Sequence, residues 1–343
     1  MSFKVIRELP SPKEIVELVP VPEEAKRIKA QRDQELKDIM EGKDHRFLLM
    51  IGPCSADDEE AVCDYVSRLA KVQEKVKEEI LIVPRIYTNK PRTTGEGYKG
   101  MLHQPNPDEA PNMLDGILAI RRMHIRAIME SGLTAADEML YTDNLAFCED
   151  LLSYIAVGAR SVENQQHRLA ASGINVPVGM KNPPSGDLTV MLHAVKAAQV
   201  SHTFIHNGSE VETTGNSYAH AIMRGSINKH GESIPNYHYE DLIFASEMYM
   251  NRKLANPLIV VDTNHANSRK CYAEQPRIAK EVLHTRKYSD LVRKLVRGLL
   301  IESYIEPGNQ EIAENRVYGK SITDACIGWA ESEALIYYIA EHA

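Results

Sequence analysis

Short β-rich apolar segments recur along this chain, and longer segments with helical periodicity separate them. Helical spacing is clear over 62–76 and 114–128, where apolar residues return every three or four positions. Strands that alternate with helices form βαβ units around a parallel sheet. Eight units predict a (β/α)8 TIM barrel, whereas five or six would favour a doubly wound sheet. The expected strands are 47–51, 80–85, 134–138, 155–158, 176–180, 203–205 or alternatively 221–223, 258–262 and 299–302.

Residues 1–45 lie outside this alternating pattern. They are expected to form an N-terminal extension with one charged helix near 23–40. A catalytic barrel over 46–343 follows and ends in a helix at 325–339. The apolar side chains of the extension indicate a subunit contact, and we expect a homodimer or homotetramer. These side chains are Ile15, Val16, Leu18 and Val19.

The composition limits the partners and the compartment. The net charge of −8 argues against nucleic acid and against an anionic membrane surface as partners. No apolar run is long enough to cross a membrane, and the N-terminus has no pattern of a secretion signal. The five cysteines are odd in number and include no CxxC pair. This argues against a disulfide framework and favours a reducing, cytoplasmic location.

The residues at or just after the ends of the predicted strands are all ionisable or able to bind a metal. In a (β/α)8 barrel these carboxyl ends form the mouth, where the chemistry takes place. Buried charges must be paired or bound to a ligand, so a purely structural barrel has no reason to gather them there. They are Cys54, Arg85, Glu138, Arg160, Lys181, Arg224, His265 and Glu302.

One subset offers sulfur, nitrogen and oxygen donors to a metal ion. Cys54, His265 and Glu302, with Asp324 as a fourth member, form a donor set for a divalent transition metal. Each has another role when taken alone. Cys54 could pack in the core, pair in a disulfide or act as a nucleophile, and His265 could be a hydrogen-bonded loop histidine. Asp324 could cap the last helix, because Ser321 to Asp324 fits a capping box.

The second subset is cationic. KPRTT (90–94) places two cations and two hydroxyl groups within one short segment. Arginine binds phosphate and carboxylate oxygens through paired hydrogen bonds, and lysine supplies a compact charge. A lone cation usually belongs to a surface salt bridge, but a whole group at one rim needs anions to neutralise it. The subset therefore predicts substrates with several negative charges; it comprises Arg85, Lys90, Arg92, Arg160, Lys181 and Arg224.

Short motifs follow one another along the chain in a distinctive order. They are IGPCS (51–55), KPRTT (90–94), GAR (158–160), VGMKN (178–182), MRG (223–225), HANS (265–268), ES-x4-GNQ (302–310) and GKSITDACIGW (319–329). In this order they resemble the type I 3-deoxy-D-arabino-heptulosonate-7-phosphate (DAHP) synthases. The resemblance extends from the N-terminal extension to the last helix. It is closest to the microbial members that respond to phenylalanine, tyrosine or tryptophan.

This resemblance implies an activity that the residues alone do not name. Phosphoenolpyruvate, erythrose 4-phosphate and water would give DAHP and phosphate, the first step of the shikimate pathway to the aromatic amino acids. One divalent metal ion (Mn, Fe, Co, Zn or Cu) would be needed. The resemblance assigns Cys54, His265, Glu302 and Asp324 to the metal, Arg85, Lys90, Arg160, Lys181 and Arg224 to phosphoenolpyruvate with Glu138 beside them, and Arg92 and Thr93 to the phosphate of erythrose 4-phosphate.

Lys90 is the candidate for delivering a proton to the developing alkoxide, since cationic neighbours lower the pKa of a lysine. Electrostatic anchoring of the substrates is the alternative role for Lys90. The expected catalytic group is then Lys90 with Cys54 and His265. In this interpretation Cys54 is a ligand rather than a nucleophile, because the reaction joins two substrates without a covalent enzyme adduct.

The chain departs from the usual motifs of the family at several places. Where many relatives have FEKPRTT, this chain has Thr88 and Asn89 before Lys90. GEGYKG (95–100) looks one residue longer than usual, and VGMKNPPSGD replaces the commoner GFKNGTDG. The segment 204–217 is several residues shorter than in feedback-sensitive relatives, where it helps form the effector site. An aromatic amino acid is the candidate effector, and we expect reduced or absent feedback inhibition.

Two other functions compete with this one. The sister synthase, which condenses phosphoenolpyruvate with arabinose 5-phosphate, is disfavoured by KPRTT and by SITDACIGW. A catalytically inactive barrel that only senses an aromatic amino acid would lack a metal ligand or a phosphate-binding cation. None of these residues is missing from the sequence.

Overall fold

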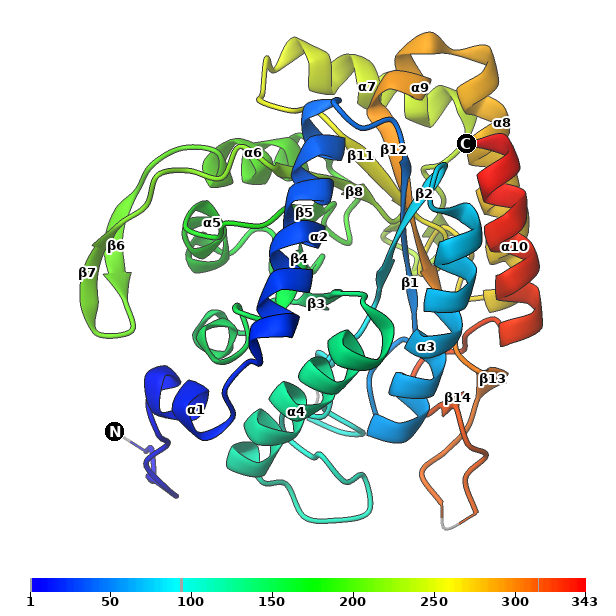
Figure 1. Cartoon of the computed structure of the whole chain (residues 1–343). Helices are drawn as coiled ribbons and strands as arrows, with labels where there is room; N and C mark the ends of the chain where they lie inside the picture. The colour runs from blue at the N-terminus through cyan, green and yellow to red at the C-terminus, as the bar shows by residue number, and fades with distance from the viewer. Residues whose placement is uncertain (1, 93–94, 314) are drawn as a thin grey trace.

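The computed structural model describes residues 2–92, 95–313 and 315–343. Eight parallel strands form a barrel at its centre, in the spatial order β2-β1-β12-β11-β8-β5-β4-β3 (Figure 1). The predicted (β/α)8 architecture is therefore confirmed. The barrel strands are β1 (Phe47–Gly52), β2 (Ile80–Pro84), β3 (Ala135–Glu138), β4 (Leu152–Val157), β5 (Val178–Lys181), β8 (Ala219–Met223), β11 (Ile259–Asp262) and β12 (Val296–Glu302).

The barrel closes between β2 and β3 through a single parallel bridge, which joins Arg85 to Ala136. The Ile86 amide donates a 2.9 Å hydrogen bond to the Ala136 carbonyl at the same place. Position 52, at the end of the adjacent strand β1, requires a glycine, because a Cβ atom there would lie 2.2 Å from the carbonyl oxygen of Arg85. This seam between β2 and β3 lies just below the predicted substrate site.

Helices surround the barrel and cover its outer face. They pack against outward-facing residues of the strands to form the larger apolar core. A second core fills the barrel itself, with Leu48, Met50, Val83 and Leu300 among its members. The surrounding helices are α3 (Glu59–Val76), α4 (Met113–Ser131), α5 (Gln165–Ser172), α6 (Leu188–Ala198), α7 (Tyr239–Asn251), α8 (Gln275–Tyr288), α9 (Asp290–Leu295) and α10 (Trp329–His342), with the 3-10 helices η1 (Thr142–Phe147) and η2 (Tyr272–Glu274).

The segment before β1 contains two helices rather than the single one predicted. The charged helix α2 (Glu23–Glu41) is present as expected, and its Leu36, Ile39 and Met40 join the core inside the barrel. The short helix α1 (Pro12–Leu18) begins with a capping box between Ser11 and Glu14. Ile15 is fully buried in the core of the same chain, so it is not available for the subunit contact predicted for it.

Three two-stranded elements lie outside the barrel. Of the two candidates for the sixth barrel strand, 203–205 was the wrong one, because it forms the outlying hairpin of β6 (Thr203–His206) and β7 (Ser209–Glu212). Its residues alternate between exposed and half-buried, whereas β8 is buried throughout. The other two elements are β9 (Ser226–Ile227) with β10 (Ser233–Ile234), and β13 (Glu306–Asn309) with β14 (Lys320–Ser321).

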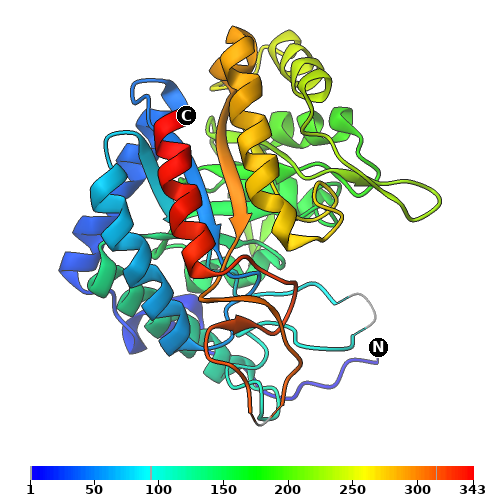
Figure 2. The same cartoon turned by 90° about the vertical axis from the view of Figure 1, so that its right-hand side faces the viewer.

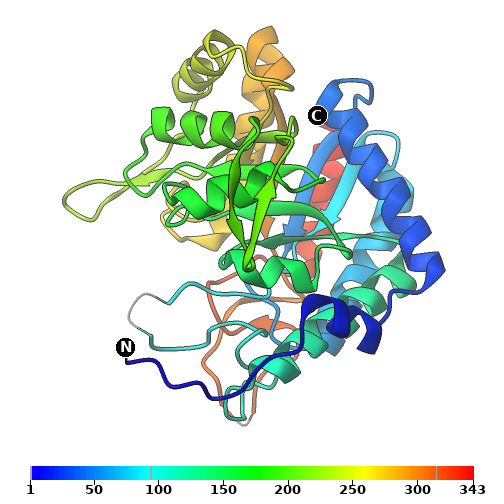
Figure 3. The same cartoon turned by 90° about the vertical axis from the view of Figure 1, so that its left-hand side faces the viewer.

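The loops that follow β2 and β12 gather at one end of the molecule. Figures 2 and 3 show the cyan segment after β2 and the orange to red segment before α10 together at this end. The last helix begins at Trp329 with Gly328 as its N-cap, four positions after the predicted start. Asp324 therefore lies in the preceding loop, and the alternative that it caps this helix is wrong. None of the helices in the described part of the chain is long and apolar enough to cross a membrane.

Candidate active site

A cavity of about 350 Å³ opens at the carboxyl ends of the barrel strands. It brings together almost all of the residues that the sequence nominated. Glu302 does not line the cavity, because it is completely buried beneath it. Thr93 lies outside the described residues. The nominated residues that line the cavity are Cys54, Arg85, Lys90, Arg92, Glu138, Arg160, Lys181, Arg224, His265 and Asp324.

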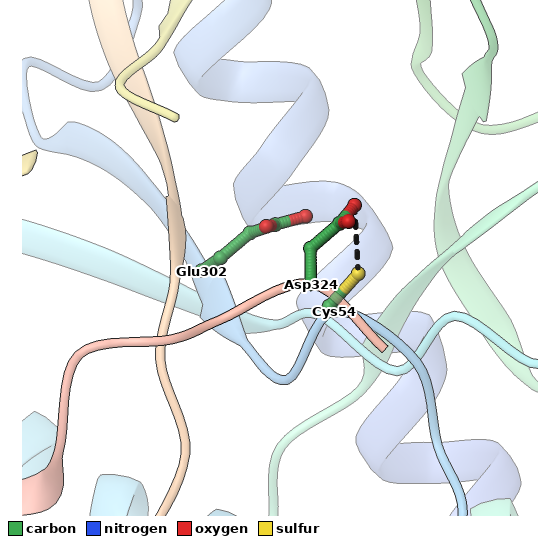
Figure 4. A group of neighbouring side chains, drawn as sticks. All are labelled: Cys54, Glu302 and Asp324. Carbon is green, nitrogen blue, oxygen red and sulfur yellow. Dashed lines mark hydrogen bonds between the residues drawn. The ribbon is translucent and has the colours of Figure 1, made fainter. Parts of the chain in front are cut away.

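Three side chains form a group of metal-ligand type at the edge of this cavity. One donor atom each from Cys54, Glu302 and Asp324 lies within 4.8 Å of the others (Figure 4). Cys54 follows β1, Glu302 ends β12, and Asp324 belongs to the loop before α10. The Cys54 sulfur lies 3.6 Å from Asp324 Oδ2. A thiolate and two carboxylates, brought together from distant parts of the chain, are a donor set for a divalent transition metal.

His265, the fourth predicted ligand, lies beside this group but not within it. Its Nε2 atom is 3.9 Å from Glu302 Oε1. Its Nδ1 atom is 2.8 Å from Asp262 Oδ2. His265 also has a positive φ of 48°, a conformation that non-glycine residues adopt only where the surroundings enforce it. The Asp262 contact takes the Nδ1 side of the ring, and Nε2 is the ring nitrogen near Glu302 of the donor group.

Cations neutralise the carboxylates of the donor group. Arg85 NH2 lies 2.9 Å from Glu302 Oε1 in a fully buried pair, and Lys90 Nζ lies 2.9 Å from Asp324 Oδ2. Burial alone would raise the pKa of Glu302, but Arg85 and then His265 hold it below its ordinary value. The pKa of Asp324 is likewise low despite burial, because of Lys90. Burial, with Glu302 nearby, raises the pKa of the Cys54 thiol.

The groups nearest to Lys90 are acidic, whereas the sequence predicted cationic neighbours. We expected cationic neighbours to lower its pKa. In the structure its ammonium group lies 2.6 Å from the Cys54 sulfur and 2.9 Å from Asp324 Oδ2. Burial acts to lower the pKa of Lys90, yet Cys54 and Asp324 raise it above its ordinary value. Lys90 is therefore held in its protonated form.

The opposite side of the cavity carries cations with fewer partners. In the described part of the chain, neither Arg160 nor Arg224 forms an ion pair, whereas Lys181 lies 3.4 Å from Glu138 Oε2. Arg160 is exposed and Arg224 is half-buried. Burial lowers the pKa of Arg224. Two unneutralised guanidinium groups in one cavity favour the binding of an anion there.

Arg92 reaches the cavity from the arm that follows β2. Its Nε donates a 3.0 Å hydrogen bond to the carbonyl of Tyr98, which fixes the position of the guanidinium group. The Lys90 amide donates a 3.0 Å hydrogen bond to the Lys99 carbonyl across the same arm. KPRTT thus leads into a loop whose two sides are hydrogen-bonded to each other.

Several residues of the site were missed at the sequence level. Asp262 contacts His265, and Asn264 donates a 2.5 Å hydrogen bond to Glu302 Oε2. Both belong to DTNHANS, so their closeness to His265 in the sequence was an available signal. Tyr87 is buried with its ring centroid 3.8 Å from the Arg85 guanidinium, and the exposed Lys270 lies 3.6 Å from Asp324 Oδ1. Nothing in the sequence marked these last two residues.

Comparison with known proteins agrees with this geometry. Residues 22–336 match the DAHP synthetase I family. The chain is 36% identical over 347 residues to the Phe-sensitive phospho-2-dehydro-3-deoxyheptonate aldolase of Escherichia coli K12, which covers 99% of this chain and 96% of that protein. It is 38% identical over 310 residues to the Trp-sensitive enzyme of Enterobacter agglomerans, covering 88% of this chain and 86% of the relative.

A solved structure shares the whole fold. The phospho-2-dehydro-3-deoxyheptonate aldolase of Francisella tularensis SCHU S4 superposes with a TM-score of 0.92 at 28% identity. The match covers 99% of this chain and 98% of that one. The family predicted from the motifs is confirmed by a sequence match and by a fold match that both span nearly the full length. The chain belongs to the DAHP synthetase I family.

Proposed function

We propose that the cavity at the barrel mouth condenses phosphoenolpyruvate with erythrose 4-phosphate and water to give DAHP and phosphate. The enzyme class, a 3-deoxy-7-phosphoheptulonate synthase, is that of the curated relatives, which match almost the entire chain. One observation carries the assignment to this cavity. Cys54 and Asp324 of the donor group open onto the same space as a set of cations for two phosphorylated substrates, with Glu302 buried behind them.

The donor group is proposed to hold one divalent metal ion. Cys54, Glu302 and Asp324 would be its ligands together with His265, whose Nε2 lies 3.9 Å from Glu302 Oε1. This set of sulfur, nitrogen and oxygen donors accepts Mn, Fe, Co, Zn or Cu. When bound, the metal supplies Lewis-acid chemistry for the aldehyde oxygen or orients the attacking water. Asp262 would orient the His265 ring, as carboxylates behind metal-bound histidines commonly do.

Phosphoenolpyruvate is assigned to the cationic side of the cavity. Arg160 and Arg224 are free of ion pairs among the described residues and suit its phosphate and carboxylate groups. Lys181 at the end of β5 and Arg85 just after β2 add charge, with Glu138 beside Lys181. Arg92 is assigned to the phosphate of erythrose 4-phosphate, with Thr93 as its expected companion. This division lets each substrate phosphate neutralise a separate part of the rim.

The residues of the chain then guide the bond changes. The methylene carbon C3 of phosphoenolpyruvate attacks the aldehyde carbon. Water adds to C2, the carbon that bears the phosphate, and phosphate leaves by cleavage of the bond between C2 and oxygen. The new alkoxide needs a proton. Lys90 is protonated between Cys54 and Asp324, so it can donate that proton or stabilise the alkoxide by charge alone.

A second site bears on regulation. The β6–β7 hairpin covers a groove of about 450 Å³. Its apolar wall, which includes Leu145, Ile174, Phe204 and Val211, could pack against an aromatic ring. Among the described residues that line it there is no lysine or arginine to pair with an effector carboxylate, while Glu149, Glu212 and His206 are present. We propose that feedback by phenylalanine, tyrosine or tryptophan is weak or absent here.

The N-terminal extension is proposed to mediate the predicted dimer or tetramer. Ile15 cannot do so, but Phe3, Val5 and Ile6 at the start of the chain are 91%, 76% and 95% exposed. Three exposed apolar side chains in so short a segment favour burial against a second copy. A cytoplasmic location agrees with free cysteines, of which Cys271 is exposed.

The direct test measures consumption of phosphoenolpyruvate by the purified protein. We expect turnover only when erythrose 4-phosphate and a divalent metal are both present. Treatment with a chelator should abolish the rate, and add-back of each candidate metal in turn should restore it. Arabinose 5-phosphate should neither replace erythrose 4-phosphate nor compete with it at equal concentration. Turnover that survives the chelator would remove the metal from the proposal, and preference for arabinose 5-phosphate would select the sister reaction.

A further inference from the structure

A buried chain of hydrogen bonds runs from β3 to the arm that carries Lys90. The Asp137 carboxylate accepts hydrogen bonds from two backbone amides through Oδ1, from Thr88 at 2.9 Å and from Glu138 at 2.7 Å. Its Oδ2 accepts the hydroxyl hydrogen of Thr88. The Thr88 oxygen in turn accepts a 3.3 Å hydrogen bond from Asn89 Nδ2. All three side chains are more than nine-tenths buried.

The direction in which these hydrogen bonds are donated sets the orientation of the Asn89 side-chain amide. Asp137 Oδ1 is taken by two amides, and Oδ2 receives the single hydroxyl hydrogen of Thr88. The Thr88 oxygen then has only lone pairs to offer, so it requires a donor. Asn89 meets this requirement with its NH2 group, because the opposite orientation would set two acceptor oxygens against each other. The carbonyl oxygen of Asn89 is thereby turned away from Thr88.

That carbonyl oxygen finds no donor in the part of the chain that the structure describes. Among the described residues no hydrogen-bond partner reaches Asn89 Oδ1, although the atom is buried. A buried acceptor without a partner is destabilising, so its persistence calls for an explanation. Asn89 also lines the substrate cavity, directly before Lys90 in the sequence and three positions before Arg92. Asn89 thus lines the same cavity as Lys90 and Arg92, the cations assigned to the aldehyde end and the phosphate end of erythrose 4-phosphate.

We propose that Asn89 determines specificity for the sugar phosphate by accepting a hydrogen bond from one of its hydroxyl groups. Thr88 and Asp137 are positioning residues that hold the amide in the required orientation. The proposal rests on the proposed function, since it assigns part of the same cavity. A polyhydroxylated aldehyde phosphate has donors between its aldehyde and its phosphate, and an aldehyde without the matching hydroxyl would leave Asn89 Oδ1 unpaired.

The test combines a substrate series with a variant series. We would measure kcat/KM for erythrose 4-phosphate and for its 2-deoxy and 3-deoxy analogues, at saturating phosphoenolpyruvate and pH 8. This pH lies above the pKa of Asp137, which burial raises to about 7, so the carboxylate is an acceptor throughout. In the wild-type protein one analogue should be used roughly tenfold less efficiently than erythrose 4-phosphate. In Asn89→Leu, which keeps the side-chain volume, that ratio should fall to about one.

Matched variants separate this role from a general effect on the site. Asn144→Ala removes an amide whose Nδ2 is also buried with no partner among residues that the structure describes, but Asn144 does not line the substrate cavity. This variant should keep the tenfold ratio. Thr88→Val should reduce the ratio, because it removes the acceptor that orients the amide, and Thr88→Ser should restore it. The Thr88 pair provides the answer if Asn89→Leu does not fold.

The possible failures are distinguishable. If the wild-type protein does not consume phosphoenolpyruvate with erythrose 4-phosphate, the proposed function itself is wrong. If it does, but the ratio is the same in wild type, Asn89→Leu and Thr88→Val, the inference about Asn89 is overturned while the function stands. A ratio near one for both analogues in the wild type would overturn it equally, because no hydroxyl would then be recognised.

Discussion

The cavity at the barrel mouth and the groove beneath the β6–β7 hairpin are similar in size, at about 350 and 450 Å³, but they differ in charge. The mouth is rich in cations. The groove has apolar walls and acidic groups, with no lysine or arginine among the described residues that line it. Converging strand ends bring ionisable groups from all over the chain to one place, whereas the groove is built from neighbouring surface segments. The difference suggests that anion recognition is concentrated at the mouth.

The largest expected effect comes from removing a donor atom at the mouth. Cys54→Ala should lower kcat by more than about 100-fold, since changes to residues behind metal ligands already cost 10- to 100-fold. Activity assays and metal analysis of the purified variant would measure this loss. Cys271→Ala is the matched control, because Cys271 is exposed and lies outside the cavity. Full activity in Cys54→Ala would eliminate the thiol as a ligand.

The cationic side of the mouth can be tested separately. Arg160→Ala should raise the KM for phosphoenolpyruvate about 10- to 100-fold, the range expected for loss of hydrogen bonds to a charged group. The KM for erythrose 4-phosphate should change much less. Arg122→Ala, an exposed arginine on the outer helix α4, should leave both constants unchanged. Equal increases in both constants for Arg160→Ala would contradict the division of the rim between the substrates.

Disrupting the contact between His265 and Asp262 should have a smaller effect than removing a donor atom. Asp262→Asn keeps the shape of the side chain but removes the charge that orients the imidazole, so metal affinity should fall by about tenfold. Calorimetric titration of the metal-free protein would measure this directly. An unchanged affinity would show that the 2.8 Å contact between Asp262 and His265 does not support the ligand set.

Addition of an aromatic amino acid, the expected ligand of the groove, should have the smallest effect on activity. Since the described lining of the groove offers no lysine or arginine for the effector carboxylate, an aromatic amino acid should bind with a Kd of about 1 mM or weaker. Phenylalanine, tyrosine or tryptophan, each added alone at about that concentration, should leave more than half of the activity. Half-inhibition by any of them at micromolar concentration would erase the contrast between the two cavities and assign the groove an effector function.

Much of the fold was predictable because its signals are local. The buried strands are short apolar runs, and the residues at or just after their ends identified seven of the lining groups by position alone. The sixth strand was ambiguous, since 203–205 and 221–223 have similar composition and only burial in the barrel distinguishes them. The short helix α1 was missed because a seven-residue helix has too little periodicity to detect.

The site was less predictable where it depends on contacts between distant residues. The high pKa of Lys90 follows from Cys54 and Asp324, which lie far from it in the sequence. A count of nearby cations in the sequence therefore gave the wrong sign. The burial of Ile15 depends on the packing of the extension onto the barrel, which no local pattern reveals. Asn89 was noted only as a departure from the family motif, and only the three-dimensional structure reveals that its oxygen has no partner among the described residues.

The seam between β2 and β3 has a mechanical consequence. Seven of the eight strand junctions are ladders of three or more residue pairs, but here one bridge at Arg85 carries the pairing. The hydrogen bonds that Thr88 donates to the Asp137 carboxylate span the same junction. They hold the two strands together where the backbone ladder is short. Under pulling force, or in transient opening seen by amide exchange, the barrel should part at this line first. The arm that carries Lys90 and Arg92 would then separate from the wall that carries Glu138, so the most easily opened part of the ring is also its catalytic edge.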